Sequence, residues 1–173
     1  MRGFILSSLI VLPLLAGCSA DDPLIPELAG RWAAPHATKL RYALLADRMQ
    51  EPPPAPSAAN EADCSGQYVT FGKKHGISLY MDGKINPLFI VREVKRERSR
   101  LILAGQAPLA AGGQAAKLEL VLRNGEVRFD DIVDERGRSI RYERFENAQA
   151  RRVGITTVGD IFRLVLDLKP CRT

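Results

Sequence analysis

The chain has 173 residues, of which 46% are hydrophobic and 26% are charged, and its formal net charge is +5 at pH 7. This hydrophobic content excludes an intrinsically disordered protein, and the length is that of one ordinary domain with a packed core. The net positive charge favours weak attraction to anionic lipid headgroups or cell-wall polymers. No nucleic-acid partner is expected, because acidic residues are interleaved with the basic ones.

The N-terminal segment has the pattern of an export signal. Arg2 precedes a short apolar run from Phe4 to Leu15, and small residues follow this run. A membrane-spanning helix needs about 20 apolar residues, and Pro13 would disturb such a helix, so a transmembrane anchor is disfavoured. An ordinary cleavage site is a second alternative, but it would leave Cys18 as an unpaired thiol in an exported protein.

The segment closes with Leu15-Ala16-Gly17-Cys18. These residues resemble the lipobox of bacterial lipoproteins, in which the cysteine is lipidated and becomes the first residue of the mature protein. The resemblance implies a signal peptide over 1–17 and three acyl chains on Cys18, palmitate among them, which would form a stable membrane anchor. Residues 18–29 are then expected to be a membrane tether.

The residue after the cysteine bears on the destination of the protein. In the family that the lipobox resembles, Asp at this position favours retention at the inner membrane, whereas this chain has Ser19. We therefore expect the lipid-anchored protein at the outer membrane, facing the periplasm. The inner membrane and the cell surface are the alternatives.

The other two cysteines, Cys64 and Cys171, form an even pair once Cys18 carries lipid. In an oxidising compartment, a disulfide between them is the default. The competing interpretation is a reactive or metal-binding thiol. The chain has no Cys-x-x-Cys and only two histidines, His36 and His75, so we expect neither a metal site nor a cofactor.

Residues 30–173 are expected to form a single β-rich domain. Its first residues, Gly30-Arg31-Trp32, resemble the first-strand signature of lipocalin-like barrels, in which the tryptophan closes one end of the barrel. The alternative is a core tryptophan beside a flexible glycine. The segment 36–51 fits a helix or a strand, with the helix favoured, and 51–63 is a proline-rich loop.

From Cys64 onward the sequence predicts an antiparallel meander. Short apolar or alternating segments are separated by turn signals, which is typical of a small barrel or a sandwich. The expected strands lie around 69–71, 77–81, 88–94, 101–104, 117–123, 127–129 and 140–143, with a small-residue loop over 105–116. The predicted fold class is therefore mainly β.

The clearest hairpin surrounds Asn124-Gly125, a dipeptide typical of a two-residue type I′ turn. This turn places Leu122 opposite Val127 and Leu120 opposite Phe129, so both apolar sets share one face. Asp131 would fall on the same face. The second strand must therefore end or bulge before it.

The C-terminal stretch changes to helical spacing. Thr157 can cap a helix whose third residue is Asp160, and Pro170 ends it. We expect this helix to lie against the sheet or to close a barrel end. Cys171 would then clamp its far end to the start of the meander at Cys64.

Little in the sequence indicates catalysis. The acids Asp130-Asp131 and Asp134-Glu135 lie near an expected turn, where adjacent carboxylates usually solvate a loop, and no catalytic residue is assigned. The run 92–100 holds five basic and two acidic residues. It is a candidate contact for anionic surfaces through Lys95, Arg96, Arg98 and Arg100, and the alternative is a strand end and turn with its charges in water.

The sequence thus predicts a lipid-anchored periplasmic envelope lipoprotein that acts as a binding or structural module and not as an enzyme. Its expected partners are the membrane, through lipidated Cys18, and a lipid or an envelope protein. The alternatives are a lipocalin-like carrier of an apolar ligand, a protein inhibitor and an envelope hydrolase. A cavity inside the sheet would distinguish the carrier from the inhibitor.

Overall fold

The computed structural model describes residues 21–34, 36, 64, 66–81, 83–108 and 113–171. The expected signal peptide, Cys18, most of the segment 36–51 and the proline-rich loop 51–63 lie outside these residues. The predictions made for them are therefore left open by the structure.

The described chain is mainly β-structure, as its alternating apolar segments predict. The strands are β1 (Trp32–Ala33), β2 (Gln67–Gly72), β3 (Gly76–Met81), β4 (Lys84–Glu97), β5 (Arg100–Gln106), β6 (Ala115–Arg123), β7 (Glu126–Asp134) and β8 (Lys169–Pro170). The helical elements are the short 3-10 helix η1 (Pro26–Leu28) and the α-helices α2 (Ala148–Arg152) and α3 (Val158–Leu166).

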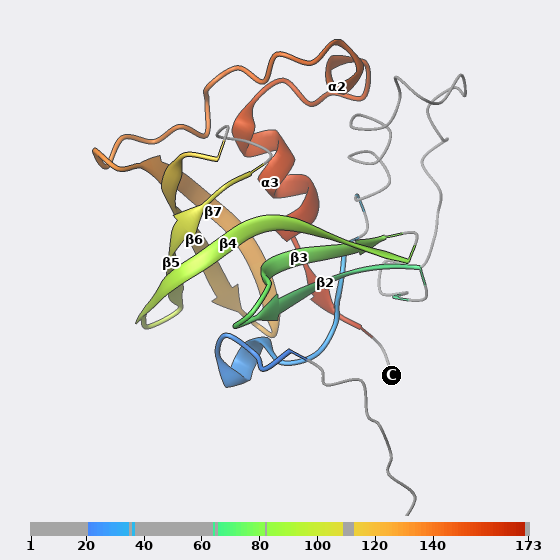
Figure 1. Cartoon of the computed structure of the whole chain (residues 1–173), viewed down its shortest axis with the longest axis vertical. Helices are drawn as coiled ribbons and strands as arrows, with labels where there is room; N and C mark the ends of the chain where they lie inside the picture. Colours follow the sequence, from blue (N-terminus) through green and yellow to red (C-terminus); the bar gives the residue numbers. More distant parts are fainter. Residues whose placement is uncertain are drawn as a thin grey trace, which may run out of the picture.

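All eight strands belong to one antiparallel sheet in the order β7-β6-β5-β4-β3-β2-β1-β8. The sheet curls into a half-barrel, with α3 against it and α2 beyond α3 (Figure 1). Its two ends approach each other where Val127 and Leu168 exchange backbone hydrogen bonds of 2.7 and 3.1 Å. The predicted mainly-β meander is confirmed. Of the two architectures left open by the sequence, the structure has the curled single sheet.

The hairpin at Asn124-Gly125 has the predicted register. Both turn residues have positive φ, at 54° and 74°, as a type I′ turn requires. Leu122 pairs with Val127 and Leu120 with Phe129. The register then shifts by one residue on the β7 side, so the bulge that the polar side chain of Asp131 demands is present.

β4 is longer than the expected strand over 88–94. Its first half pairs with β3 and its second half with β5, and a register shift occurs in each pairing. These bulges bend the strand, so one long strand can belong to both sides of the half-barrel. Gly105 of β5 permits the bend, because a β-carbon there would overlap the backbone carbonyl of Ile90.

α3 is the C-terminal helix that the sequence predicts, but it ends at Leu166 and not at Pro170, because Leu168 pairs with Val127 of the sheet. Thr157 and Asp160 form a reciprocal capping box at its start. Its buried face includes Phe162, whose ring stacks on that of Phe129 with the centroids 5.8 Å apart. The helix therefore covers β7, where the sheet would otherwise expose its apolar side.

The expected strand over 140–143 is wrong. Ser139 forms a single bridge with Val133, and the chain then turns, because the Glu143 amide donates to the carbonyl of Ile140. The carbonyls of Arg141 and Glu143 accept from the amides of Gly159 and Val158 at the start of α3. This backbone therefore bonds to the helix terminus, whose first amides lack partners within the helix.

The expected tether over 18–29 is also wrong from Asp21 onward. The Leu24 amide donates to the carbonyl of Phe71 at 2.9 Å, and the Lys73 amide donates to the carbonyl of Asp22 at 2.8 Å. Leu28 in η1 is fully buried and accepts a hydrogen bond from the indole nitrogen of Trp32. Residues 21–29 belong to the folded domain because they pair with the end of β2 and bury an apolar side chain.

Candidate functional site

The interior of the half-barrel is filled by apolar side chains. Leu118 and Leu120 of β6 are fully buried, and Phe129 of β7 is 9% exposed. All three belong to one continuous core with Phe162 of α3, and Leu122 packs against that core. The interior that an apolar ligand would need is therefore occupied by the protein's own side chains in the part of the chain that is described.

Two hollows lie on the solvent side of the sheet, with volumes of about 250 and 360 Å³. Both are open, and both include Glu93, Ala104 and Lys117 in their lining. The larger one has an apolar floor between charged walls, formed by Glu93, Lys95, Ile102, Lys117, Glu119 and Val133. We call this surface, over β4 to β7, the outer groove.

The charges around the outer groove are mixed. The register aligns Lys95, Ile102, Glu119 and Asp131 across four neighbouring strands. Arg100 lies 3.5 Å from the carboxylate of Glu119, within ion-pair distance. Exposed pairs of this kind contribute little to stability.

The other notable arrangement lies at the turn between β2 and β3, where Asp21 meets the hairpin. Its carboxylate accepts hydrogen bonds from the backbone amides of Lys74 and His75, at 2.9 to 3.1 Å, and lies 3.2 Å from His75 Nδ1. Gly72 leaves the space for it, because a β-carbon there would overlap the carboxylate. We call this contact the Asp21 latch.

The latch changes the titration of Asp21. Partial burial of the carboxylate acts to raise its pKa, but the hydrogen bonds from Lys74 and His75, together with the charge of His75, outweigh burial and lower the pKa. A carboxyl group with a lowered pKa in the folded state stabilises that state above its unfolded pKa of about 3.9. This contribution is lost as the pH falls through the lower, folded-state pKa.

Removing the latch gives a local prediction. In Asp21→Ala, the Lys74 and His75 amides lose a charged acceptor, so the free energy of opening at this turn should fall by roughly 1–3 kcal/mol at neutral pH. Amide hydrogen exchange measures this change, and the difference from the wild type should vanish in acid, below the folded pKa. Asp22→Ala is the matched control, because the Asp22 side chain is 80% exposed and lies 4.0 Å from Lys73 Nζ. Equal exchange in the wild type and Asp21→Ala would show that the latch is not formed in solution.

The four predicted basic contacts do not share one surface. Lys95 lies beside Glu97 at 2.7 Å, and Arg100 contacts Glu119 and Asp130, both on the solvent side of the sheet. Arg96 lies in contact with Glu27 of η1. Arg98 lies at the β4–β5 turn, with a positive φ of 56°. Anionic-surface contact by all four residues together stays a prediction, and this arrangement does not favour it.

The acidic residues near the end of β7 are held by local structure. Asp131 accepts from the hydroxyl of Ser139 at 2.7 Å, and Arg100 pairs with Asp130. Asp134 accepts from the backbone amides of Arg136 and Arg138. Its pKa is lowered, chiefly by the Arg138 amide bond, with Arg138's charge assisting. Each carboxylate therefore has a structural role in the bulge or the turn.

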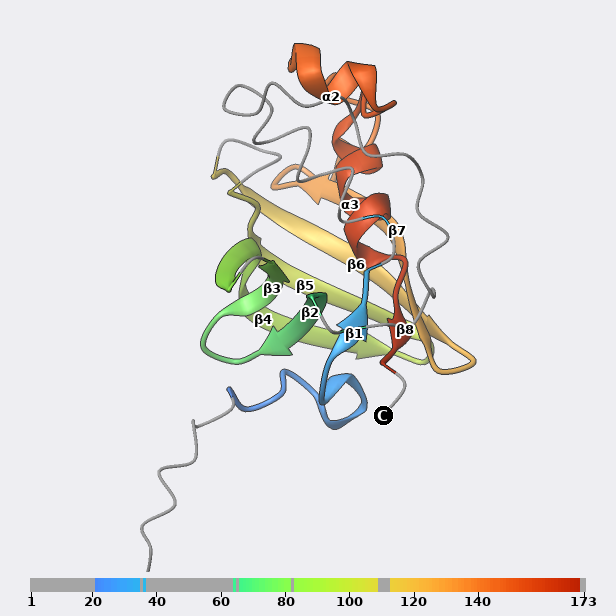
Figure 2. The ribbon, with the colours of Figure 1, turned by 90° about the vertical axis from the view of Figure 1, so that its right-hand side faces the viewer.

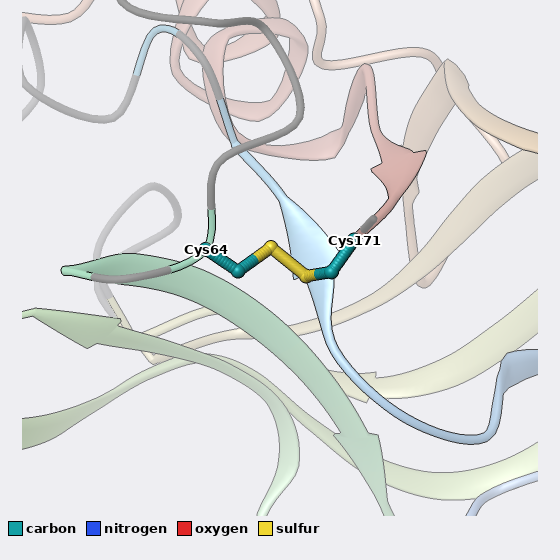
Figure 3. The surroundings of a disulfide bond; sticks show 2 residues. All are labelled: Cys64 and Cys171. Carbon is teal, nitrogen blue, oxygen red and sulfur yellow. A yellow bond between two sulfur atoms is a disulfide. The ribbon is translucent and has the colours of Figure 1, made fainter. Parts of the chain in front are cut away.

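The sulfur atoms of Cys64 and Cys171 lie at disulfide distance, with their Cα atoms 5.8 Å apart (Figure 3). The pair joins the chain just before β2 to the chain just after β8. The Cys171 amide also donates to the carbonyl of Arg31 beside β1. The pairing that the count of cysteines predicts thus ties together three segments that are far apart in the sequence.

No family model, curated protein or solved structure matches this chain. Within the described residues, no helix combines the length and apolar character needed to cross a bilayer. The same residues contain no group of three His, Cys, Asp or Glu side chains placed to hold a metal ion.

Reasoning from the sequence missed the Asp21 latch. Asp21 and His75 are 54 positions apart, and no periodicity links them. The available signal was indirect: a glycine-flanked turn, Gly72 to Gly76, carries two lysines and a histidine, and its backbone amides are free to bind an acid. Which acid they bind depends on the packing of the N-terminal segment against the hairpin.

Proposed function

We propose that this protein is a lipid-anchored envelope lipoprotein whose β-domain works as a binding or structural module through its outer surface. The main support for this proposal is that the interior of the half-barrel is filled. Leu118, Leu120, Phe129 and Phe162 occupy the space in which a carrier would hold an apolar ligand. The lipobox-like sequence at Cys18 supplies the anchor, and the outer membrane facing the periplasm is the proposed location.

The composition of the outer groove favours a protein as the binding partner. Its apolar floor between charges of both signs resembles the composition of transient protein interfaces, which combine an apolar centre with a polar rim. Surface pairs of mixed sign favour selection among partners more than affinity. A protein inhibitor, whose rigid surface meets an enzyme, is the variant of this function that the same groove would serve.

A lipocalin-like carrier is less well supported, because Trp32 of the lipocalin-like motif is a buried core residue whose indole nitrogen donates to the carbonyl of Leu28. An envelope hydrolase is also less well supported, because Asp130, Asp131 and Asp134 each hold a local structural contact. We infer that the domain has no catalytic activity. The Cys64–Cys171 pair would be oxidised in the periplasm and would keep the binding surface rigid.

The anchor is tested by Cys18→Ser. Because the lipidated residue is removed, this variant should accumulate in the unprocessed form and should not incorporate labelled palmitate. Mass spectrometry of the membrane-extracted protein measures the missing acyl chains. Cys64→Ser is the control, since it removes a different cysteine and should leave the acyl mass unchanged. Normal processing and lipidation of Cys18→Ser would contradict the proposal.

The filled interior is tested by organic extraction of the purified domain. We expect no stoichiometric apolar molecule in the extract, because core side chains occupy the interior. A lipid recovered at one molecule per chain would favour the carrier. Binding of a partner protein that is lost on charge reversal at Lys117, and kept on charge reversal at Lys84 on another part of the surface, would support the outer groove.

A further inference from the structure

We propose that the end of the half-barrel carrying the β2–β3 turn and η1 lies against the membrane, with Lys73, Lys74 and Arg98 facing anionic phospholipid headgroups. This inference rests on the proposed lipidation of Cys18. It adds a fixed orientation to the anchored domain. The expected 12-residue tether would have left the domain free to turn.

The anchor between Cys18 and the folded domain is short. Asp21 is held to the β2–β3 turn by the amides of Lys74 and His75, and Asp22 by the amide of Lys73. Three residue steps separate Cys18 from Asp21, and an extended chain advances at most about 3.6 Å per residue. Acyl chains on Cys18 therefore hold the Asp21 backbone within about 11 Å of the bilayer surface, and the turn is hydrogen-bonded directly to the Asp21 side chain.

The β4–β5 turn lies at the same end of the molecule as the anchor. η1 and α2 lie at opposite ends of the molecule (Figure 2). Arg96 contacts Glu27 of η1, so the β4–β5 turn with Arg98 lies at the same end as the anchor. The β3–β4 turn lies away from the β2–β3 turn, at the opposite end of β3.

The anchored end of the molecule carries exposed positive charges. The Lys73 side chain is 65% exposed, and Lys74 and Arg98 are also exposed. Among the described residues, neither Lys74 nor Arg98 has an acidic partner within ion-pair distance. The acids at this end are engaged: Asp21 with the turn amides and His75, Glu27 with Arg96, and Glu97 with Lys95. Asp22 lies near Lys73.

The distance places these cations where the membrane field acts. A charge is screened over about 8–10 Å at physiological ionic strength, which is close to the maximum reach of the anchor. Each lysine or arginine near an anionic bilayer strengthens association by roughly fivefold. The short anchor and the cationic end therefore act together to orient the domain. In this orientation, the outer groove lies on the side of the domain and stays accessible to a partner in the periplasm.

The test uses the mature, lipidated chain in vesicles that contain a headgroup spin-labelled lipid. A fluorophore is attached to a new cysteine at the anchored end in Ser99→Cys, or at the far end in Arg152→Cys. Flotation with the vesicles establishes lipidation independently of orientation. We expect the probe at 99 to be quenched several times more strongly than the probe at 152. Equal quenching in protein that floats would overturn the orientation, whereas failure to float would overturn the proposed lipidation.

Two further variants separate the anchor from the charge. Twelve Gly and Ser residues inserted between Ala20 and Asp21 should remove most of the difference in quenching between the two probes. In vesicles with anionic phosphatidylglycerol, Lys73→Gln/Lys74→Gln should weaken quenching at 99, and the charge-matched Lys84→Gln/Lys117→Gln should not. In vesicles of neutral phosphatidylcholine, the two double variants should behave alike. An equal response of both double variants to anionic lipid would overturn the contact with headgroups.

Discussion

Cys64→Ser is expected to lower the free energy of unfolding by up to about 4–5 kcal/mol, because the disulfide closes a long loop of the unfolded chain. The two cysteines are 107 positions apart. In the chain-entropy model, a link over such a distance removes much of the freedom of the unfolded state. This loss is a large fraction of the stability of an ordinary domain, so the variant should unfold at much lower denaturant concentration.

The measurement is denaturant unfolding of the wild type, the variant and the wild type under reducing conditions. Cys171→Ser and the double variant are the matched controls, and all should agree with Cys64→Ser, since each opens the same loop. A difference in gel mobility between reduced and non-reduced samples that persists in Cys64→Ser would count against the proposed pair. So would a single variant with wild-type stability under non-reducing conditions.

Phe162→Ala is expected to cost about 3–5 kcal/mol, the range for removing a buried phenylalanine. The Phe162 side chain is 2% exposed and stacks on Phe129 at a centroid distance of 5.8 Å. Its removal would leave a cavity between α3 and β7, where the helix covers the sheet. Thermal or denaturant unfolding measures the loss.

Arg163→Ala is the matched control on the solvent side of the same helix. Its guanidinium is about half exposed and lies 4.0 Å from Asp160, a distance at which a surface ion pair contributes little. We therefore expect a change within about 0.5 kcal/mol. If Phe162→Ala lowered the free energy of unfolding as little as Arg163→Ala, α3 would not be packed on the sheet in solution.

The local features of the fold were predictable where a few adjacent residues decide the structure. The Asn124-Gly125 turn, its register and the bulge before Asp131 follow from backbone geometry and from alternation over one hairpin. The start of α3 follows from Thr157 and Asp160, which satisfy amides only one turn away. The pairing of Cys64 with Cys171 was predicted from parity together with the expected oxidising compartment.

The expected strand over 140–143 shows the limit of alternation. Ile140 and Tyr142 have strand spacing, but an alternating pattern does not say which backbone will supply hydrogen bonds. The start of α3 offers amides without helical partners, and the carbonyls of Arg141 and Glu143 bond to them. The segment therefore turns beside β7 and does not extend the sheet.

The candidate site was predictable only in part. The run 92–100 was correctly identified as basic, but the structure divides it between the sheet face, η1 and a turn, because the contacts of Arg96 and Arg100 lie on different elements. Residues 21–29 have the composition of a linker. No local signal shows that Asp21 will meet amides of Lys74 and His75.

By itself, the sequence determined the mainly-β meander, its central hairpin and the capped C-terminal helix, because short-range geometry and periodicity suffice for each. It also determined the expectation of a lipid anchor at Cys18. Only the tertiary structure decided that the sheet curls around a filled interior, that the outer groove lies on its solvent side, and that residues 21–29 belong to the folded domain. These features depend on contacts between residues tens of positions apart, since packing density and the pairing of buried polar groups are properties of the whole fold.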